Sequence, residues 1–368
     1  MIPVVPWLLL VVTVGAPPAD GSNTLPASQA SQASPARQAA ASPPTATAVV
    51  PQAPGDDAMP IKIGPLRFGG FLQGDGVLGV GDHDHTTLNV ELDSFRLRRA
   101  RLSVGGDVTP EIAWTVQADL AHPTVLTDAY ITFHHSRLAN VRVGQFVAPF
   151  GLERLTSEAR NEAYERVIDR FVPSRDIGIM VFAPAPVWKG ISYAAAIING
   201  AGQNARDNNA AKDYVGRVTW QVPGVPGVKV GANAQSGTQP AGRRTRVGAD
   251  VTVEEGSYHI AAEWLRETRD ECGAGECGGY YLLATRRFRP ASPRPSFYMV
   301  ELVGRVFALR DPSDPRLGPP GTTHREWEVG VNYYFARSAK AAVHLLTPIS
   351  RRPGEPATVL AARLQVIF

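Results

Sequence analysis

Polar and apolar residues alternate in short runs along most of this sequence, from about residue 66 to its end. The run 112–120 shows the pattern clearly: its even-numbered positions are Ile, Trp, Val, Ala and Leu, and Thr115, Gln117 and Asp119 stand between them. An alternation with a period of two predicts β-strands whose two faces meet different surroundings. About sixteen such runs follow one another, and short turns alternate with longer connections rich in Gly, Pro and charge.

This arrangement favours a closed barrel over two stacked sheets. An even number of strands, with short turns at one end and long loops at the other, is typical of single-chain bacterial membrane barrels. A soluble antiparallel protein could share the alternation, but its apolar faces would pack against a second sheet. The last run ends in Phe368 on its apolar face, which also fits an outer-membrane strand. We therefore predict an all-β, transmembrane, antiparallel up-and-down β-barrel of about 16 strands over residues 63–368.

The first sixty or so residues have a different composition. Residues 2–15 form an apolar run too short to span a membrane, and small residues follow it, so we interpret 1–19 as a secretory signal peptide. No Lys or Arg precedes Arg37, so the basic segment that usually opens such a peptide is missing. Residues 20–62 are rich in Ala, Pro and Ser without apolar periodicity, which predicts a disordered tether.

Charge matters here through its position rather than its total. The formal net charge of the 368 residues is +3, which does not indicate a nucleic-acid partner. The basic residues are mostly arginines, and no lysine occurs between Lys62 and Lys189.

Arginines crowd the run 95–102, whose sequence is FRLRRARL. Arg99 and Arg101 share the polar face of the predicted strand. Arg96 and Arg98 would then face lipid, at a cost of about 2–4 kcal/mol each near mid-membrane. Either these two lie at the outer rim, or a β-bulge near Arg98 shifts the phase of the strand. The simpler interpretation of these basic strand residues is that they pair with Asp119, Asp128 and lipid phosphates.

One long polar insert, residues 151–175, interrupts the series of strands and carries five arginines and four glutamates. Thr156 or Ser157 could cap a short helix, and Glu162 and Arg166 have the i,i+4 spacing of a helical ion pair. One interpretation is a solvated loop of compensating ion pairs. The other, which we favour, is a third outer loop that folds inward and narrows the bore.

The arginines of the predicted inward faces and of the insert form the candidate site. A guanidinium stays charged and offers several donors to an oxyanion, and conduction requires several weak sites rather than one tight site. The candidate pore-lining and anion-binding residues are Arg98, Arg99, Arg101, Asp128, Arg142, Arg154, Ser157, Arg160, Arg166, Arg170, Arg217, Arg305 and Arg363.

The other motifs predict little further chemistry. Cys272 and Cys277, the only cysteines, lie in a Gly-rich loop, and an exported protein would pair them in a disulfide. Residues 74–79 match G-x-G-x-x-G, but no helix pattern follows them. The Asp-His-Asp-His of 82–85 is interpreted as a solvated turn. No catalytic motif occurs, so we expect neither an enzyme nor a bound metal or cofactor.

Several segments together resemble the phosphate-selective porin O and P family. They are FRLRRARL (95–102), Asp-Ala-Tyr-Ile (128–131), Val-Gly-Gln-Phe with Pro-Phe-Gly-Leu-Glu (143–153) and Arg-Asp-Ile-Gly (175–178). The resemblance continues to the terminal Phe368. It implies a sixteen-stranded, homotrimeric porin of the bacterial outer membrane with an inward-folded third outer loop. The implied partners are inorganic anions such as phosphate or chloride, outer-membrane lipid, and the barrel-assembly machinery through the strand ending at Phe368.

The same resemblance implies roles for particular residues. The arginines at 98, 99 and 101 and the insert around 156–170 would form the anion zone, and Asp128 would keep the ions moving. The insert contains no lysine, whereas phosphate-preferring members use lysine as well as arginine. We therefore expect general anion passage rather than strict phosphate selectivity. The alternative is a plugged, non-conducting barrel with a structural or adhesive role.

Overall fold

A computed structural model describes the chain except for its first sixty residues and several loops. The described residues are 61–80, 92–240, 242–269, 272, 277–292, 294–317, 322–349 and 358–368. The predicted signal peptide, residues 20–60 of the predicted tether, and the motif at 82–85 lie outside these ranges.

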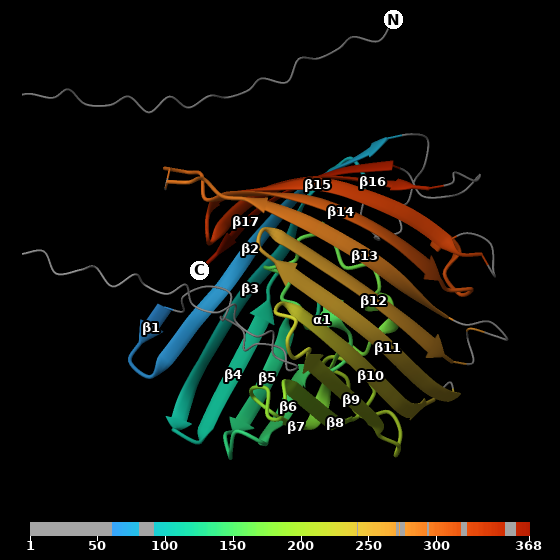
Figure 1. The fold of residues 1–368 in the computed structure, drawn as a ribbon. Helices are drawn as coiled ribbons and strands as arrows, with labels where there is room; N and C mark the ends of the chain where they lie inside the picture. Colours follow the sequence, from blue (N-terminus) through green and yellow to red (C-terminus); the bar gives the residue numbers. More distant parts are fainter. Residues whose placement is uncertain are drawn as a thin grey trace, which may run out of the picture. The chain divides into compact units, whose positions relative to one another are not determined.

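The described strands form a closed antiparallel barrel, shown in Figure 1. Each strand from β2 to β17 pairs with its neighbours in sequence, and β17 pairs with β2 to close the ring of sixteen. The predicted barrel is therefore confirmed. The strand bounds are β2 Leu66–Val80, β3 Ser94–Thr109, β4 Ile112–Asp119, β5 Leu126–Phe133, β6 Asn140–Val147, β7 Arg175–Phe182, β8 Ile191–Ile198, β9 Asp213–Gln221, β10 Val228–Gln239, β11 Gly242–Glu255, β12 Tyr258–Thr268, β13 Cys277–Phe288, β14 Met299–Arg310, β15 His324–Ala336, β16 Ala339–Pro348 and β17 Thr358–Ile367.

A short additional strand precedes the barrel. Strand β1 (Ile61–Ile63) pairs antiparallel with the first residues of β2, with Ile63 opposite Leu66. The described strands thus begin two residues inside the segment predicted as tether, because Ile61 and Lys62 pair with β2.

The two ends of the barrel differ in their connections. The turns at 110–111, 222–227, 256–257 and 337–338 share one end with the C-terminal Phe368, and we call it the short-turn end. The opposite, long-loop end carries the connection 199–212 and the insert, defined from here on as residues 148–174 between β6 and β7.

Alternating burial along the strands follows the predicted pattern. On β4, Thr115, Gln117 and Asp119 are buried inside the barrel, whereas Val116 is exposed on the outside, as is Leu120 just beyond the strand. This is the reverse of a soluble fold, in which the apolar face would be the buried one. An apolar outward surface of this kind is suited to contact with an apolar environment rather than with water.

Helices are short in the described part of the chain, where no helix has the length and apolar character needed to cross a membrane. The insert contains α1 (Leu152–Leu155) and the 3-10 turn η1 (Asp169–Phe171), and η3 (Pro315–Leu317) lies in a loop. The helix predicted to begin at Thr156 or Ser157 is wrong. Helix α1 ends there instead, with Thr156 as its C-cap.

A residue of the barrel wall explains why α1 begins at Leu152 rather than after Thr156. The backbone N–H groups of Leu152 and Glu153 donate to the two carboxylate oxygens of Glu263 on β12, at 2.8 Å each. These are the free donors at a helix start, and a carboxylate satisfies them. No local sequence signal could have shown this cap, because Glu263 is 110 residues away.

Candidate functional site

A β-bulge turns the first arginine-rich run toward the interior. The pairing of β2 with β3 slips by one residue between Gln73 and Gly74, which leaves Arg98 as an extra residue on β3. Leu97 then faces outward with 57% of its surface exposed, and Arg96 and Arg98 reach carboxylates inside the barrel. The bulge alternative is confirmed, and the strand avoids the cost of arginines on its outward face.

The insert crosses the interior from β6 and β7 to the strands on the opposite wall, as Figure 1 shows for α1. Helix α1 binds Glu263 on β12, as described above. Further along, Lys340 of β16 donates from Nζ to the carbonyl of Asn161 at 2.8 Å, and Gln365 of β17 donates to the carbonyl of Ala159 at 2.8 Å. The insert is therefore fixed to walls far from its own strands.

An apolar cluster holds one side of the insert. Phe150, Ile168 and Phe171 of the insert are fully buried and pack with inward-facing side chains such as Leu265 and Phe307. Burying each such side chain stabilises the folded insert by about 1.5–3 kcal/mol. Sequence analysis missed this cluster. The signal was available in the strands of this wall, where apolar residues occupy inward as well as outward positions.

Glu158 of the insert binds three arginines at once. Its carboxylate lies 2.5 Å from Arg99 Nε, 2.5 Å from Arg101 Nη2 and 3.0 Å from Arg166 Nη1. Asp119 adds a contact of 3.1 Å to Arg101 Nε. Burial by itself would raise the pKa of Glu158, but the charges of the three arginines outweigh burial and hold that pKa well below its usual range.

Glu165 of the insert forms a second centre of ion pairs. It lies 2.6 Å from Arg98 Nε and 2.6 Å from Arg363 Nη2. Arg363 also donates from Nε to Asp75 at 2.8 Å. Arg96 also lies 3.1 Å from Asp75, so three arginines share one carboxylate of the insert and one of the wall.

A third centre surrounds Arg305. Its guanidinium lies 3.2 Å from Glu153 and 2.5 Å from Glu328. Glu153 also accepts the backbone N–H groups of Val167 (2.9 Å) and Ile168 (3.0 Å), so it ties two parts of the insert together. Burial raises the pKa of Glu153 to about 7, although Arg305 opposes the shift.

Most of the remaining candidates also lie beside carboxylates. The pairs are Arg154 with Asp169 (2.7 Å), Arg170 with Asp314 (2.6 Å), Arg217 with Asp250 (2.6 Å) and the candidate Asp128 with Arg175 (3.0 Å). Ser157 accepts the N–H of Ala159 at 3.3 Å within a turn of the insert.

These pairs show that most of the candidate arginines already have a carboxylate partner, which differs from the expected series of weak anion sites. A buried guanidinium without a counter-charge is costly, and a carboxylate at hydrogen-bond distance offsets that cost. The expected helical pair of Glu162 with Arg166 is also absent from the described contacts, because Arg166 binds Glu158 while Glu162 contacts His259 and Arg287.

Arg142 is different from the other inward arginines. Its guanidinium carbon lies 4.1 Å from the centre of the Tyr130 ring and 5.2 Å from that of Phe182, and its Nε donates weakly to Thr132 at 3.4 Å. Only 6% of the residue is exposed, and no carboxylate pairs with it within the described ranges. Aromatic faces stabilise the cation without cancelling its charge.

A basic cavity of about 270 Å³ lies between the insert and the wall at the short-turn end. Five cationic side chains line it and only two carboxylates, Glu162 and Glu301, do. Arg287 binds both carboxylates. The cationic residues are Arg160, Arg287, Arg289, Arg337 and Lys340.

Four of these five cations were not predicted as site residues. Arg287 could have been found, because it continues the inward series of Tyr281 and Thr285 on β13. Arg289 and Arg337 follow strand ends, where alternation no longer shows which way a side chain points.

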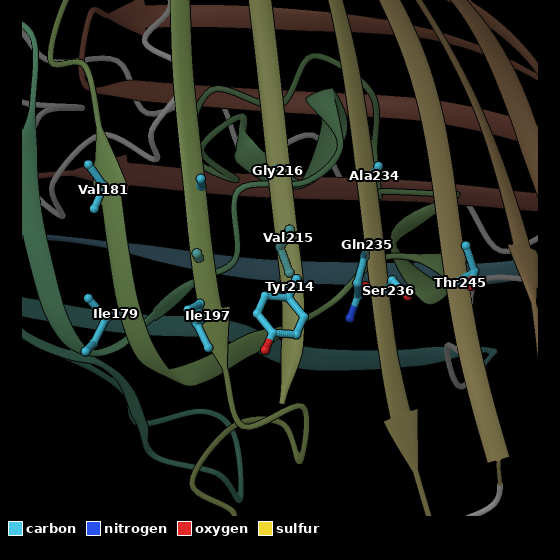
Figure 2. Close-up of a pocket in the computed structure, with 12 residues that line it drawn as sticks. Ile179, Val181, Ile197, Tyr214, Val215, Gly216, Ala234, Gln235, Ser236 and Thr245 are labelled. Carbon is cyan, nitrogen blue, oxygen red and sulfur yellow. The ribbon is translucent and has the colours of Figure 1, made fainter. Parts of the chain in front are cut away.

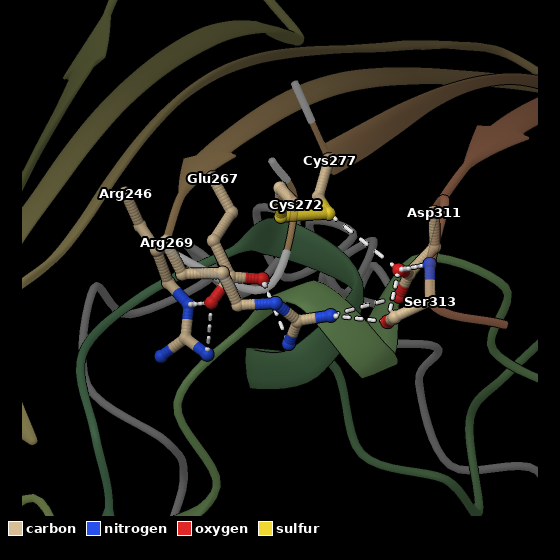
Figure 3. Close-up of a disulfide and its surroundings, with 7 residues drawn as sticks. All are labelled: Arg246, Glu267, Arg269, Cys272, Cys277, Asp311 and Ser313. Carbon is tan, nitrogen blue, oxygen red and sulfur yellow. Dashed lines mark hydrogen bonds and ion pairs between the residues drawn. A yellow bond between two sulfur atoms is a disulfide. The ribbon is translucent and has the colours of Figure 1, made fainter. Parts of the chain in front are cut away.

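The predicted disulfide is present. Cys272 and Cys277 are bonded at the long-loop end, and both are buried. As Figure 3 shows, an ion-pair network lies beside the bond: Arg269 contacts Asp311 at 3.0 Å and Glu267 at 3.6 Å. The bond anchors the start of β13 to the loop before it and takes no part in the basic cavity.

Comparison with known proteins agrees with this architecture. Residues 77–245 match the family model described as phosphate-selective porin O and P. Among curated protein sequences, none matches the chain.

Solved porin structures share the fold at low sequence identity. OmpF of Salmonella typhi, solved in complex with daunomycin, is 9% identical with a TM-score of 0.61, over 82% of this chain and 97% of the other. An anion-selective porin from Comamonas acidovorans is 10% identical with a TM-score of 0.58, over 82% of this chain and 99% of the other. The outer-membrane channel DcaP of Acinetobacter baumannii is 10% identical with a TM-score of 0.58, over 82% of this chain and 97% of the other. The chain is therefore a β-barrel of the bacterial outer membrane with the fold of a porin, and its residues 77–245 match the model of the phosphate-selective porin O and P family.

Proposed function

We propose that this porin lets small solutes cross the outer membrane passively, with a preference for anions. The observation that carries this proposal is the basic cavity at the short-turn end, where five cationic side chains face two carboxylates. An excess of fixed positive charge in a narrow space raises the local concentration of anions and lowers that of cations.

Arg142 supports the proposal from a second position. Because rings rather than a carboxylate hold its guanidinium, its positive charge adds to the field inside the barrel, although the side chain is buried. The matched arginines around Glu158 and Glu165 contribute less field, because two carboxylates offset most of the charge of each group of three arginines. We propose weak, general anion passage, of chloride and phosphate among others, rather than a tight phosphate site.

The test is the current through the purified full chain in a planar lipid bilayer. With a KCl gradient across the bilayer, the reversal potential should have the same sign as the equilibrium potential of chloride. Adding phosphate should reduce the chloride current only slightly if the sites are weak. A strong, saturable block by phosphate would instead indicate a dedicated phosphate site.

The second candidate is a plugged barrel with a structural role. It is favoured by the matched ion pairs, which fix the insert inside the barrel at many points. Protein that inserts into the bilayer but carries no current would support this candidate over the first.

Two assembly properties complete the proposal. By analogy with its family, the barrel forms a homotrimer, and the strand that ends at Phe368 is recognised by the barrel-assembly machinery. Native mass spectrometry of the detergent-solubilised protein tests the first property. Surface expression of a Phe368→Ala variant, which should fall, tests the second.

A further inference from the structure

The outer surface of the barrel carries a groove that the proposed transport function does not use. It has a volume of about 630 Å³ and crosses strands β7 to β11 (Figure 2). Its rim includes Ile197 and Tyr214, which are exposed on the outside. Its floor includes the small outward residues Ala195, Gly216 and Ala234. The volume falls within the range of sites for small ligands.

The strand register shows why a groove forms here. Ala195, Gly216 and Ala234 lie opposite one another on β8, β9 and β10, so three small side chains meet in one row. In the next row toward the long-loop end, Ile197 and Tyr214 are paired and stand higher. A Cβ atom placed at Gly216 would meet nothing within 4 Å, so the floor is open space.

The groove lies on the long-loop half of the membrane surface. Tyr214 and Trp220 point outward from the two ends of β9, with 61% and 40% of their surface exposed. Exposed aromatic residues of this kind mark the two interfaces of the apolar band of a membrane barrel. Tyr214 is at the long-loop end of β9, so the groove opens into the leaflet on the loop side.

An unmatched cation lies just beyond the groove. On the outward face of β11, Arg243 is two residues from Thr245, which lines the groove, or about 7 Å along the strand. Arg243 is exposed, and no carboxylate pairs with it in the part of the chain that the structure describes. It lies on the headgroup side of Tyr214, because Thr238, its partner on β10, is one row beyond Ser236, the partner of Tyr214.

From this geometry we infer that the groove and Arg243 together form a binding site for one phosphate-bearing lipid of the outer leaflet. An acyl chain fills the apolar row above Ala195, Gly216 and Ala234. The phosphate accepts charge-assisted hydrogen bonds from the Arg243 guanidinium, for which it is a well-matched partner. The Tyr214 ring lies between the acyl chain and the phosphate, at the membrane interface that aromatic side chains prefer.

Native mass spectrometry of the full chain in detergent, titrated with diphosphorylated lipid A, tests the inference. The wild-type barrel should retain lipid with defined stoichiometry of one per chain. Arg243→Gln should weaken retention roughly tenfold, as the loss of a charge-assisted bond implies. Gly216→Leu, which fills the floor without a clash, should weaken it to a similar degree. Lipid A stripped of its phosphates should bind the wild type as poorly as intact lipid A binds Arg243→Gln.

Two matched controls separate the site from general lipid adhesion. Arg325 is an exposed outward arginine at the long-loop end of β15, and Gly74 is an outward glycine of β2 whose Cβ would also meet open space. Arg325→Gln and Gly74→Leu should retain lipid like the wild type. Equal losses in the controls, or unchanged retention in both groove variants, would overturn the inference. So would a change of oligomeric state in Gly216→Leu with lipid retention intact, because the groove would then be a contact between copies of the chain.

Discussion

The arginines around Glu158 and the cations of the basic cavity have the same chemistry but opposite consequences. Around Glu158, three guanidinium groups share one insert carboxylate and a neighbouring aspartate. In the cavity at the short-turn end, five cationic side chains share two carboxylates. The first group fixes the insert in place, and the second has an excess of cationic over acidic side chains along a cavity. The number of arginines inside a barrel therefore says little about ion selectivity until each one has been matched to its carboxylates.

The largest expected effect comes from removing the shared carboxylate of the matched group. Glu158→Gln leaves Arg99, Arg101 and Arg166 buried with too little negative charge, which should cost about 3–5 kcal/mol in the free energy of unfolding. Urea unfolding followed by tryptophan fluorescence measures this cost. Glu255→Gln, an exposed carboxylate at the end of β11, should change the midpoint very little. Equal midpoints for the two variants would show that the pairs around Glu158 do not hold the insert.

A pH dependence should appear next, within the same matched region. Burial raises the pKa of Glu153 to about 7 from an ordinary value of 4.5, so its protonated form favours the folded insert. The stabilisation is complete below about pH 4.5 and is lost as the pH rises through 7, by up to roughly 3 kcal/mol. Hydrogen exchange at the amides of Val167 and Ile168, corrected for intrinsic rates, should show protection falling over this range.

The control for that experiment is Glu153→Gln, which cannot titrate. Its protection at the same two amides should be independent of pH. Protection that rises with pH in the wild type would contradict the assignment, because ionised Glu153 would then be the better partner for Arg305.

A pair of arginine variants compares the two regions directly. Arg217→Gln leaves the buried Asp250 without its cation and should cost about 2–3 kcal/mol of stability. Arg142→Gln loses the contacts with Tyr130 and Phe182 and one weak hydrogen bond to Thr132, and it should cost about 1 kcal/mol. It should nevertheless reduce anion preference more than Arg217→Gln does. Unfolding midpoints and reversal potentials of both variants supply the four values. If Arg142→Gln lost more stability than Arg217→Gln, or lost less anion preference, the distinction between arginines paired with carboxylates and Arg142, which contacts two rings, would be contradicted.

The smallest expected effect is on permeability alone. The double variant Arg289→Glu with Arg337→Glu reverses two charges of the basic cavity and should lower the anion-to-cation permeability ratio by about threefold. Arg137→Glu changes an exposed arginine in the turn 134–139 at the same end, outside the residues that line the cavity, and should leave the ratio nearly unchanged.

The sequence predicted the wall of the barrel better than its contents. Alternation placed Thr115, Gln117 and Asp119 inward, because a strand face is decided by its nearest neighbours in sequence. The bulge at Arg98 could be anticipated because a regular strand would place that arginine against lipid, at a cost in free energy. Contacts between insert and wall join residues far apart in the sequence, such as Leu152 and Glu263, which are 111 positions apart, and no local pattern encodes them.

The same limit explains the errors about the site. The candidate arginines lie on inward faces or on the insert, and Arg98 does so only through the bulge. The pairing of Arg101 with Asp119 was among the alternatives that the sequence offered, but the carboxylates of the insert were not predicted as partners. Arg305 is an example: Glu153 lies 152 residues away, and Glu328 lies on the next strand. Arg142 could not be distinguished from Arg217 by sequence, since only the fold shows that one meets two rings and the other meets Asp250.

The most direct test of the account is the sign of the reversal potential of the wild-type channel in a KCl gradient at neutral pH. The excess of cationic over acidic side chains along the basic cavity, with Arg142, predicts a potential displaced toward the equilibrium value of chloride. A displacement toward the equilibrium value of potassium would contradict the account, because the carboxylates of the interior would then dominate the field that a solute meets.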